Sequence, residues 1–182
     1  MTKMVDKTYE ILLAGFGGQG ILFAGKELSY AGMKSDHFIS WIPSYGPEMR
    51  GGTCNCSVVI SNEIVGCPIV TSPNVLIVMN APSFDKFEPT VVPGGLIIAD
   101  STTLTRGCSR DDVTYIELPA TQMGIDNNMR SLANMILIGK LLKETQMFDY
   151  DFFKEIVASS IPASKKDLLE QNMKAMDLGY NY

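Results

Sequence analysis

The chain has 182 residues, of which 46% are hydrophobic, and a formal net charge of -5, which predicts one globular domain over residues 1–182. Its longest basic run is the pair Lys165-Lys166, so nucleic acid is excluded as a main partner because phosphate neutralisation needs a basic face. No apolar run approaches the ~18 residues of a membrane span and the polar start lacks the apolar core of a signal peptide, so we expect a cytoplasmic protein without membrane contact.

A strand, a glycine turn and a helix open the chain. The apolar run 11–14 predicts the strand, Gly15-Phe16-Gly17-Gly18-Gln19-Gly20 follows it, and residues 20–31 predict a helix that stops at Gly32. The G-x-G-x-x-G spacing places backbone N–H groups at a helix N-terminus, where an anion binds favourably. The alternative is that these glycines only let the strand and the helix pack closely.

The second strand argues against a dinucleotide cofactor. It is predicted over residues 37–42 and ends in Pro43-Ser44-Tyr45. A dinucleotide site needs an Asp or Glu at the end of this strand to bind a ribose hydroxyl, and Asp36 lies at the wrong end. Nicotinamide or flavin binding, and with it an independent dehydrogenase, is therefore disfavoured.

Residues 43–53 predict a polar loop, because their prolines and glycines exclude a helix or a regular strand. It carries the hydroxyls of Ser44 and Tyr45, the carboxylate of Glu48 and the guanidinium of Arg50. A loop that leaves the carboxyl end of a sheet strand lies where open α/β folds bind ligands. The alternative is a rigid crossover in which Glu48 and Arg50 pair with each other.

The rest of the chain predicts further strands and then helices. A return strand at 64–70, after a turn at 62–63, would make the sheet mixed, and Pro68 would put it at an edge. Asn80 follows a buried strand and either caps the next helix or contacts a ligand at the rim of the glycine turn. Asp149 or Asp151 is expected to cap the helix that ends near residue 159. The remaining predicted elements are strands at 53–61, 74–79, 96–100 and 113–118, helices at 82–87, 129–144 and 167–178, and a loop or short helix at 119–125. We therefore predict an α/β protein, a three-layer α/β/α fold with a mostly parallel, mixed central sheet and a Rossmann-like glycine turn.

Catalytic groups are missing from these patterns. The chain has a single histidine, His37, so it has no Ser-His-Asp or Cys-His set, and no Lys-Ser/Thr follows the glycine turn as a P-loop requires. Cys54, Cys56, Cys67 and Cys108 form no cluster motif, which disfavours a metal site and indicates reduced, mostly buried thiols. A glycine turn that favours anion binding, in a chain without a catalytic residue, suggests a subunit that closes the active site of another chain.

Three stretches of the chain resemble the gamma subunits of the 2-oxoacid:ferredoxin oxidoreductases: 15–20, 40–52 and 79–83. The resemblance runs from about Tyr9 to the last helices, and Tyr-Gly-Pro-Glu-Met-Arg-Gly-Gly at 45–52 is its most specific part. Within the family, the 2-oxoglutarate enzymes are the most similar. The gamma chains of the branched-chain 2-oxoacid and pyruvate enzymes, and the smaller indolepyruvate oxidoreductase subunit, are also similar.

The resemblance implies that the holoenzyme decarboxylates a 2-oxoacid, with 2-oxoglutarate expected, on thiamine diphosphate with Mg. Electrons then pass through [4Fe–4S] clusters to ferredoxin, and the acyl group passes to coenzyme A. These cofactors are implied to belong to alpha and beta subunits, with delta a further candidate, while this chain binds none alone and closes the coenzyme A side. The residues expected at that site are Gly17, Gly18, Gln19, Gly20, Ser44, Tyr45, Glu48, Arg50, Gly51, Gly52 and Asn80.

Two expectations about association remain open beside this assignment. The chain could instead be a stand-alone nucleotide- or anion-binding module. A domain that closes another chain's site should also expose an apolar, methionine-bearing patch at the carboxyl rim of the sheet or on a flanking face. Expressed alone, it could form a homodimer through that patch.

Overall fold

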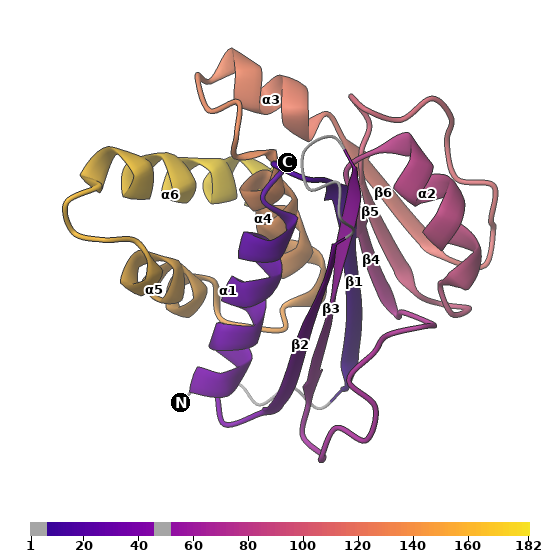
Figure 1. Cartoon of the computed structure of the whole chain (residues 1–182). Coiled ribbons are helices and arrows are strands. Elements are labelled where there is room, and N and C mark those ends of the chain that lie inside the picture. The colour runs from indigo at the N-terminus through magenta and orange to yellow at the C-terminus, as the bar shows by residue number, and fades with distance from the viewer. Residues whose placement is uncertain (1–6, 46–51) are drawn as a thin grey trace.

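The computed structural model describes residues 7–45 and 52–182, which form one mixed sheet with helices on both faces (Figure 1). The predicted α/β class is confirmed. The elements are, in order, β1 (Tyr9–Phe16), α1 (Ile21–Lys34), β2 (Phe38–Tyr45), β3 (Thr53–Ser61), β4 (Val75–Val78), α2 (Ala81–Phe87), η1 (Glu88–Thr90), β5 (Leu96–Asp100), β6 (Thr114–Leu118), α3 (Ala120–Asp126), α4 (Ala133–Thr145), α5 (Tyr150–Ser160) and α6 (Lys166–Tyr180).

The strand order is β2-β3-β1-β4-β5-β6. The pairs β1–β4, β4–β5 and β5–β6 are parallel, whereas β3 is antiparallel to both β1 and β2. The predicted return strand at 64–70 is wrong, because both edges of β3 are already occupied by β1 and β2. The segment instead crosses one face of the sheet, where the Val70 N–H donates to Ser57 Oγ at 3.2 Å.

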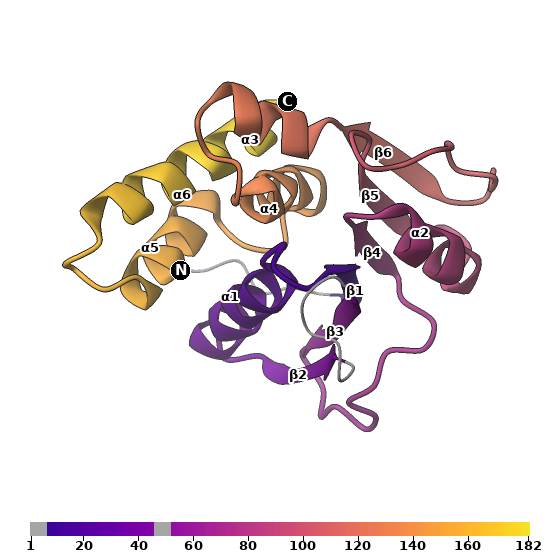
Figure 2. The ribbon, with the colours of Figure 1, turned by 45° about the horizontal axis from the view of Figure 1, so that its top comes forward.

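Two separate cores make the three layers (Figure 2). On one face, α1 and α4 cover the sheet, and α5 and α6 lie outside them. On the other face, α2 packs its buried Phe84 against Leu12, Leu76 and Val78. The three-layer prediction is therefore confirmed, with the second helical layer much smaller than the first.

The long connection from β5 to β6 completes the smaller layer and is held by Glu88 of η1. Its carboxylate accepts hydrogen bonds from Ser109 N–H at 2.5 Å and Cys108 Sγ at 3.2 Å, and it pairs with the Arg106 guanidinium at 2.6 Å. Burial acts to raise the pKa of Glu88, but the hydrogen bonds from Arg106, Ser109 and Cys108 outweigh it and lower the pKa to about 2. Glu88 is therefore an ionised carboxylate that holds this connection against the sheet, where, in the described part of the chain, no helix covers it.

The predicted ends of the second strand and of the first helix are wrong. The second strand continues through Pro43 to Tyr45. Proline, which lacks a backbone N–H, is tolerated here because β2 is an edge strand and has a neighbour on one side only. Helix α1 continues past Gly32 to Lys34. A Cβ on Gly32 would lie 2.8 Å from Ile39 Cγ2, so this glycine permits close packing of α1 on β2 and does not end the helix.

The C-terminal helices agree with the sequence apart from their ends. Helix α4 begins at Ala133, because residues 129–132 form turns. Asp149 is the cap of α5, since its side chain accepts from the Phe152 N–H at 3.0 Å. Within the described residues, no helix combines the length and apolar character that a membrane crossing requires.

Candidate functional site at the carboxyl rim of the sheet

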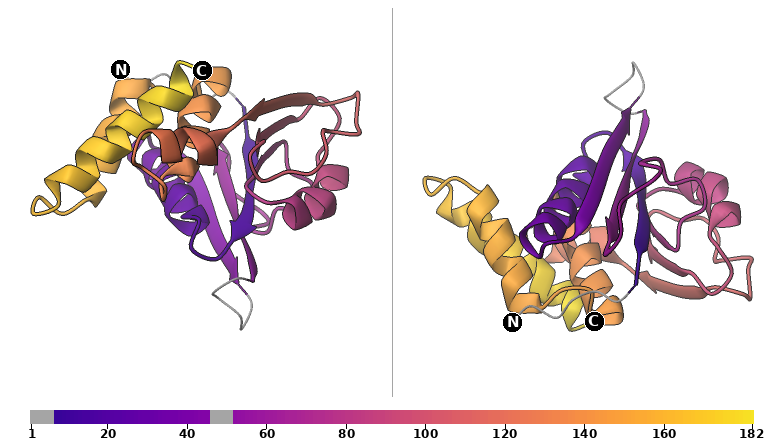
Figure 3. Two further views of the ribbon diagram at one scale, coloured as in Figure 1. Left: turned by 90° about the horizontal axis from the view of Figure 1, so that it is seen from above. Right: turned by 90° about the horizontal axis from the view of Figure 1, so that it is seen from below.

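The carboxyl ends of β1 and β4 form a topological switch point. The two strands are parallel neighbours, with Ala14 paired with Val78. The chain leaves β1 for α1 on one face and leaves β4 for α2 on the other, as the views along the sheet show (Figure 3). Open α/β sheets bind ligands at such points, because the diverging connections leave a crevice between them.

The glycine turn gives this rim an uncapped helix start. Gly18 (φ 100°) and Gly20 (φ 76°) have left-handed backbones that other residues adopt at a cost. Helix α1 has no side-chain cap and no acidic residue in its first turn. Its first N–H groups lack intrahelical partners, and the helix dipole favours negative charge beside them. The turn therefore suits an anionic group.

The Gln19 side chain stabilises the rim through two hydrogen bonds to the backbone. Its Oε1 accepts from the Phe16 N–H at 2.5 Å, and its Nε2 donates to the Met79 carbonyl at 2.9 Å. A Cβ on Gly15 would lie 2.6 Å from Gln19 Oε1, so Gly15 makes room for this arrangement. Gln19 thus ties the glycine turn to the end of β4.

The glycine turn and the polar loop meet, as the predicted site requires. The Gly17 N–H donates to the Gly52 carbonyl at 3.0 Å, directly beyond the last β1–β3 pair. Ser44 is exposed on β2 at the same end of the sheet, where it pairs with Asn55 of β3.

The other predicted loop residues are only partly placed. Tyr45 is paired with Cys54 through the backbone. Glu48, Arg50 and Gly51 lie outside the described residues. Ligand contacts by all of the predicted site residues stay predictions.

Asn80 has one of its two predicted roles. Its Oδ1 accepts from the Ser83 N–H at 2.8 Å and so caps α2. Asn80 is 1% exposed, and within the described part of the chain its Nδ2 and the Ser83 Oγ have no hydrogen-bond partner. Two buried polar groups therefore lie next to the switch point.

The roles of two further residues that organise the rim were not predicted. Asn134 of α4, which is 4% exposed, donates from Nδ2 to the Gly20 carbonyl at 3.1 Å and so holds α4 against the start of α1. Asp100 at the end of β5 accepts from the N–H and the hydroxyl of Thr121, which fixes the start of α3. Asn134 could have been found as the polar residue inside the apolar run of α4.

The cysteines do not supply chemistry at this rim. All four are free thiols. Cys56 is buried and donates to the Ile21 carbonyl at 3.6 Å, and burial raises the pKa of its thiol to about 12. Across residues 7–45 and 52–182, no group of three or more His, Cys, Asp or Glu side chains is arranged to hold a metal ion.

Comparison with known proteins finds a matching family and several relatives. The family described as "Pyruvate ferredoxin/flavodoxin oxidoreductase" matches residues 10–182. The ketoisovalerate oxidoreductase subunit VorA of Methanothermobacter thermautotrophicus is 36% identical over 93% of the chain, but the chain spans only 35% of VorA. The 2-oxoglutarate synthase subunit KorC of Methanocaldococcus jannaschii is 32% identical over 98% of the chain and 95% of KorC.

Solved structures show the same fold. The gamma subunit of a keto/oxoacid ferredoxin oxidoreductase from Geobacter sulfurreducens matches with a TM-score of 0.83 and 24% identity over 96% of this chain and 95% of that one. A 2-oxoglutarate:ferredoxin oxidoreductase from Magnetococcus marinus with 2-oxoglutarate, coenzyme A and succinyl-CoA bound matches with a TM-score of 0.87 and 21% identity. That match covers 97% of this chain and 31% of the matched one.

Proposed function

This chain belongs to the pyruvate ferredoxin/flavodoxin oxidoreductase family as a gamma subunit, and we propose that its enzyme converts 2-oxoglutarate to succinyl-CoA with reduction of ferredoxin. The support for 2-oxoglutarate is the relative KorC, named a 2-oxoglutarate synthase subunit, which this chain covers almost end to end. The structure with 2-oxoglutarate and coenzyme A bound contains a domain of the same fold. VorA, of which this chain spans only 35%, supports a branched-chain substrate as the second candidate.

Within that enzyme, we propose that this chain closes the active site on its coenzyme A side. The observation that carries this proposal is the hydrogen bond from the Gly17 N–H to the Gly52 carbonyl, which joins the glycine turn to the polar loop at one rim. Coenzyme A is polyanionic, and an uncapped helix start and a guanidinium are the two groups best suited to phosphate. In this proposal the amides of Gly18 and Gly20 and the side chain of Arg50 hold a phosphate or orient an acidic partner loop beside it.

The cofactors of the reaction are proposed to lie on partner chains. The described residues offer no ligand set for a [4Fe–4S] cluster, because the buried thiols of Cys54 and Cys56 lie apart from other ligands. Thiamine diphosphate with Mg supplies the decarboxylation chemistry when it is bound in the complex. This chain's residues contribute binding and water exclusion at the acyl-transfer side, so the chain alone should show no turnover.

Kinetics of the assembled enzyme test the proposal. Arg50→Ala should raise the KM for coenzyme A about tenfold, the effect of losing one charge-assisted contact of ~1.5 kcal/mol. Decarboxylation and the first electron transfer precede coenzyme A and should change little. If Arg50 only pairs with Glu48, then Arg50→Ala and Glu48→Ala would both weaken assembly and leave this KM unchanged.

Three further measurements separate the alternatives. Turnover by the purified chain with 2-oxoglutarate, coenzyme A, thiamine diphosphate and a viologen would contradict the subunit role. If the chain never co-purifies with alpha and beta subunits, a stand-alone anion-binding module is favoured instead. A higher kcat/KM for ketoisovalerate than for 2-oxoglutarate in the complex would select the second candidate substrate.

A further inference from the structure

An exposed apolar surface lies on the edge strand β2, on the side of the sheet away from α1. Phe38 and Ile42 of β2 are 49% and 39% exposed, and Ile69 of the segment after β3 is 59% exposed. We call these three side chains and the β2 backbone between them the β2 apolar surface. It ends at Ile42, two residues before Ser44 at the rim, and includes none of the residues predicted to contact coenzyme A.

Two hydrogen bonds place Ile69 beside the two β2 residues. Ser40, between Phe38 and Ile42 in the strand, donates from Oγ to the Pro68 carbonyl at 3.4 Å. Ser57, the direct cross-strand partner of Ile42, accepts from the Val70 N–H. The segment around Ile69 therefore crosses the same face from which Phe38 and Ile42 project.

This surface lacks the features that keep an exposed edge strand from associating. No charged residue occurs from Phe38 to Ser44 or from Ile64 to Asn74. Natural edge strands that remain in solvent carry lysines, inward-pointing charges or bulges. In β2 only Pro43, near its end, has that effect. Depletion of charge with aromatic and aliphatic exposure is instead typical of the centre of a protein interface.

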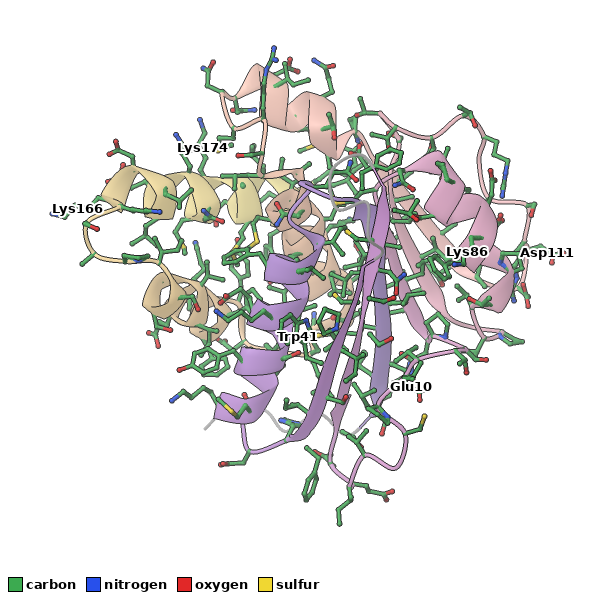
Figure 4. All side chains as sticks on the ribbon, in the orientation of Figure 1. Glu10, Trp41, Lys86, Asp111, Lys166 and Lys174 are labelled. Atoms are coloured by element: carbon green, nitrogen blue, oxygen red, sulfur yellow. The ribbon has the colours of Figure 1, made fainter. Side chains whose placement is uncertain are left out.

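Charged side chains lie around this surface and on the far flanks of the molecule. Glu10, in the cross-strand row of Ser40, is exposed on the same face of the sheet (Figure 4). Glu63, at the start of the segment that crosses this face, is also exposed. Lys166 and Lys174 project from α6 on the opposite side of the molecule. The border that faces a partner here is therefore acidic.

We propose that the β2 apolar surface is the docking site for the subunit that corresponds to the extra length of the longer relatives. This inference rests on the proposed function. This domain matches about a third of VorA, whereas it matches almost all of KorC, which is named a subunit. By analogy with KorC, we take the remaining part of VorA to correspond to a separate partner subunit. The expected partner surface has apolar side chains at its centre, Lys or Arg opposite Glu10 and Glu63, and a segment that covers the free edge of β2.

The test uses the complex reconstituted from this chain and its alpha and beta subunits. Ile42→Asp and Ile69→Asp should each weaken assembly about a hundredfold, because each buries an unpaired carboxylate. Leu168→Asp on α6, at 37% exposure, is the matched control and should assemble as the wild type does. Thermal melting of each isolated variant should match the wild type, because the substituted side chains are exposed. Hydrogen exchange of the β2 amides should slow when the wild-type complex forms.

The outcomes distinguish failure of this surface from failure of the proposed function. If the wild-type complex is active with 2-oxoglutarate but both β2 variants assemble normally, the docking site is refuted and the proposed function stands. If the wild-type chain forms no complex with alpha and beta subunits, both fail. If Ile42→Asp dissociates a homodimer of the isolated chain and leaves the complex with alpha and beta subunits intact, a second copy of this chain binds the β2 apolar surface and the proposal is wrong.

Discussion

A methyl group at Gly179 should force apart the two helices that carry the larger core. Helix α6 crosses α4 at Gly139 and Gly179. A Cβ on Gly179 would lie 1.7 Å from the Ile136 carbonyl oxygen, and a Cβ on Gly139 would lie 2.1 Å from the Met176 carbonyl oxygen. The obstacle is helix backbone on both sides, which cannot rotate away as a side chain would.

The magnitude follows from that geometry. Ordinary carbon contacts need about 3.5 Å, so α4 and α6 must separate by more than ~1 Å along their crossing. Overpacking of a core typically costs 1–3 kcal/mol, and alanine returns up to ~1 kcal/mol through its higher helix propensity. We expect Gly179→Ala to lower the free energy of unfolding by about 2 kcal/mol and the Tm by about 4–8 °C.

Thermal and urea unfolding of the isolated chain, followed by circular dichroism, measure the effect. The Gly139→Ala/Gly179→Ala double variant should lose less than the sum of the single variants, because helices already separated accommodate the second methyl group. Gly66→Ala is the control, since a Cβ there meets nothing within 4 Å and its change should stay within ~0.5 kcal/mol or be stabilising. A Gly179→Ala chain that unfolds at the wild-type temperature would refute the packing argument.

Two further substitutions test the anchors of the smaller layer. Glu88→Gln should cost about 3 kcal/mol at neutral pH, because the folded pKa of about 2 lies below the ordinary value of 4.5. That stability is present above pH 4.5 and lost as the pH falls towards 2, so urea titrations should show a flatter acid dependence in the variant, and an unchanged slope would contradict the assignment. Asn80→Ala should lose about 1 kcal/mol of unfolding free energy through the α2 cap, while Asn80→Ser retains most of it; equal losses in urea melts would argue against capping.

The sequence predicted the elements well where local pattern decides them. The apolar runs at β1, β4 and β5 and the helical spacing in α1 identify these elements because burial selects their side chains directly. Gly32 predicts a helix stop that the structure does not have, because glycine has the same local signature at a C-cap and at a close helix–strand contact. Only the distance to Ile39 separates these two uses.

The candidate site was predictable only in outline. The glycine turn and the polar loop could be assigned to one rim, since both follow strands that end at the same side of the sheet. Gln19 hydrogen-bonds to the backbone of Phe16 and of Met79. The contact with Met79 depends on β4, which is remote in sequence from the glycine turn. The contact of Asn134 with Gly20 joins residues that are 114 positions apart, and no local pattern predicts it.

The position of the switch point follows from the strands on either side of β1. Because β2 lies on one side of β1 and β4 on the other, the chain from β1 to β2 crosses towards one edge of the sheet, while the chain from β4 to β5 crosses towards the other. Crossovers between parallel strands are right-handed, so two crossovers in opposite directions place their helices on opposite faces. The separate cores of α1 and α2 agree with this. The same strand order places β2 at an edge of the sheet, so it accounts both for the crevice at the rim and for the free edge at the surface proposed for docking.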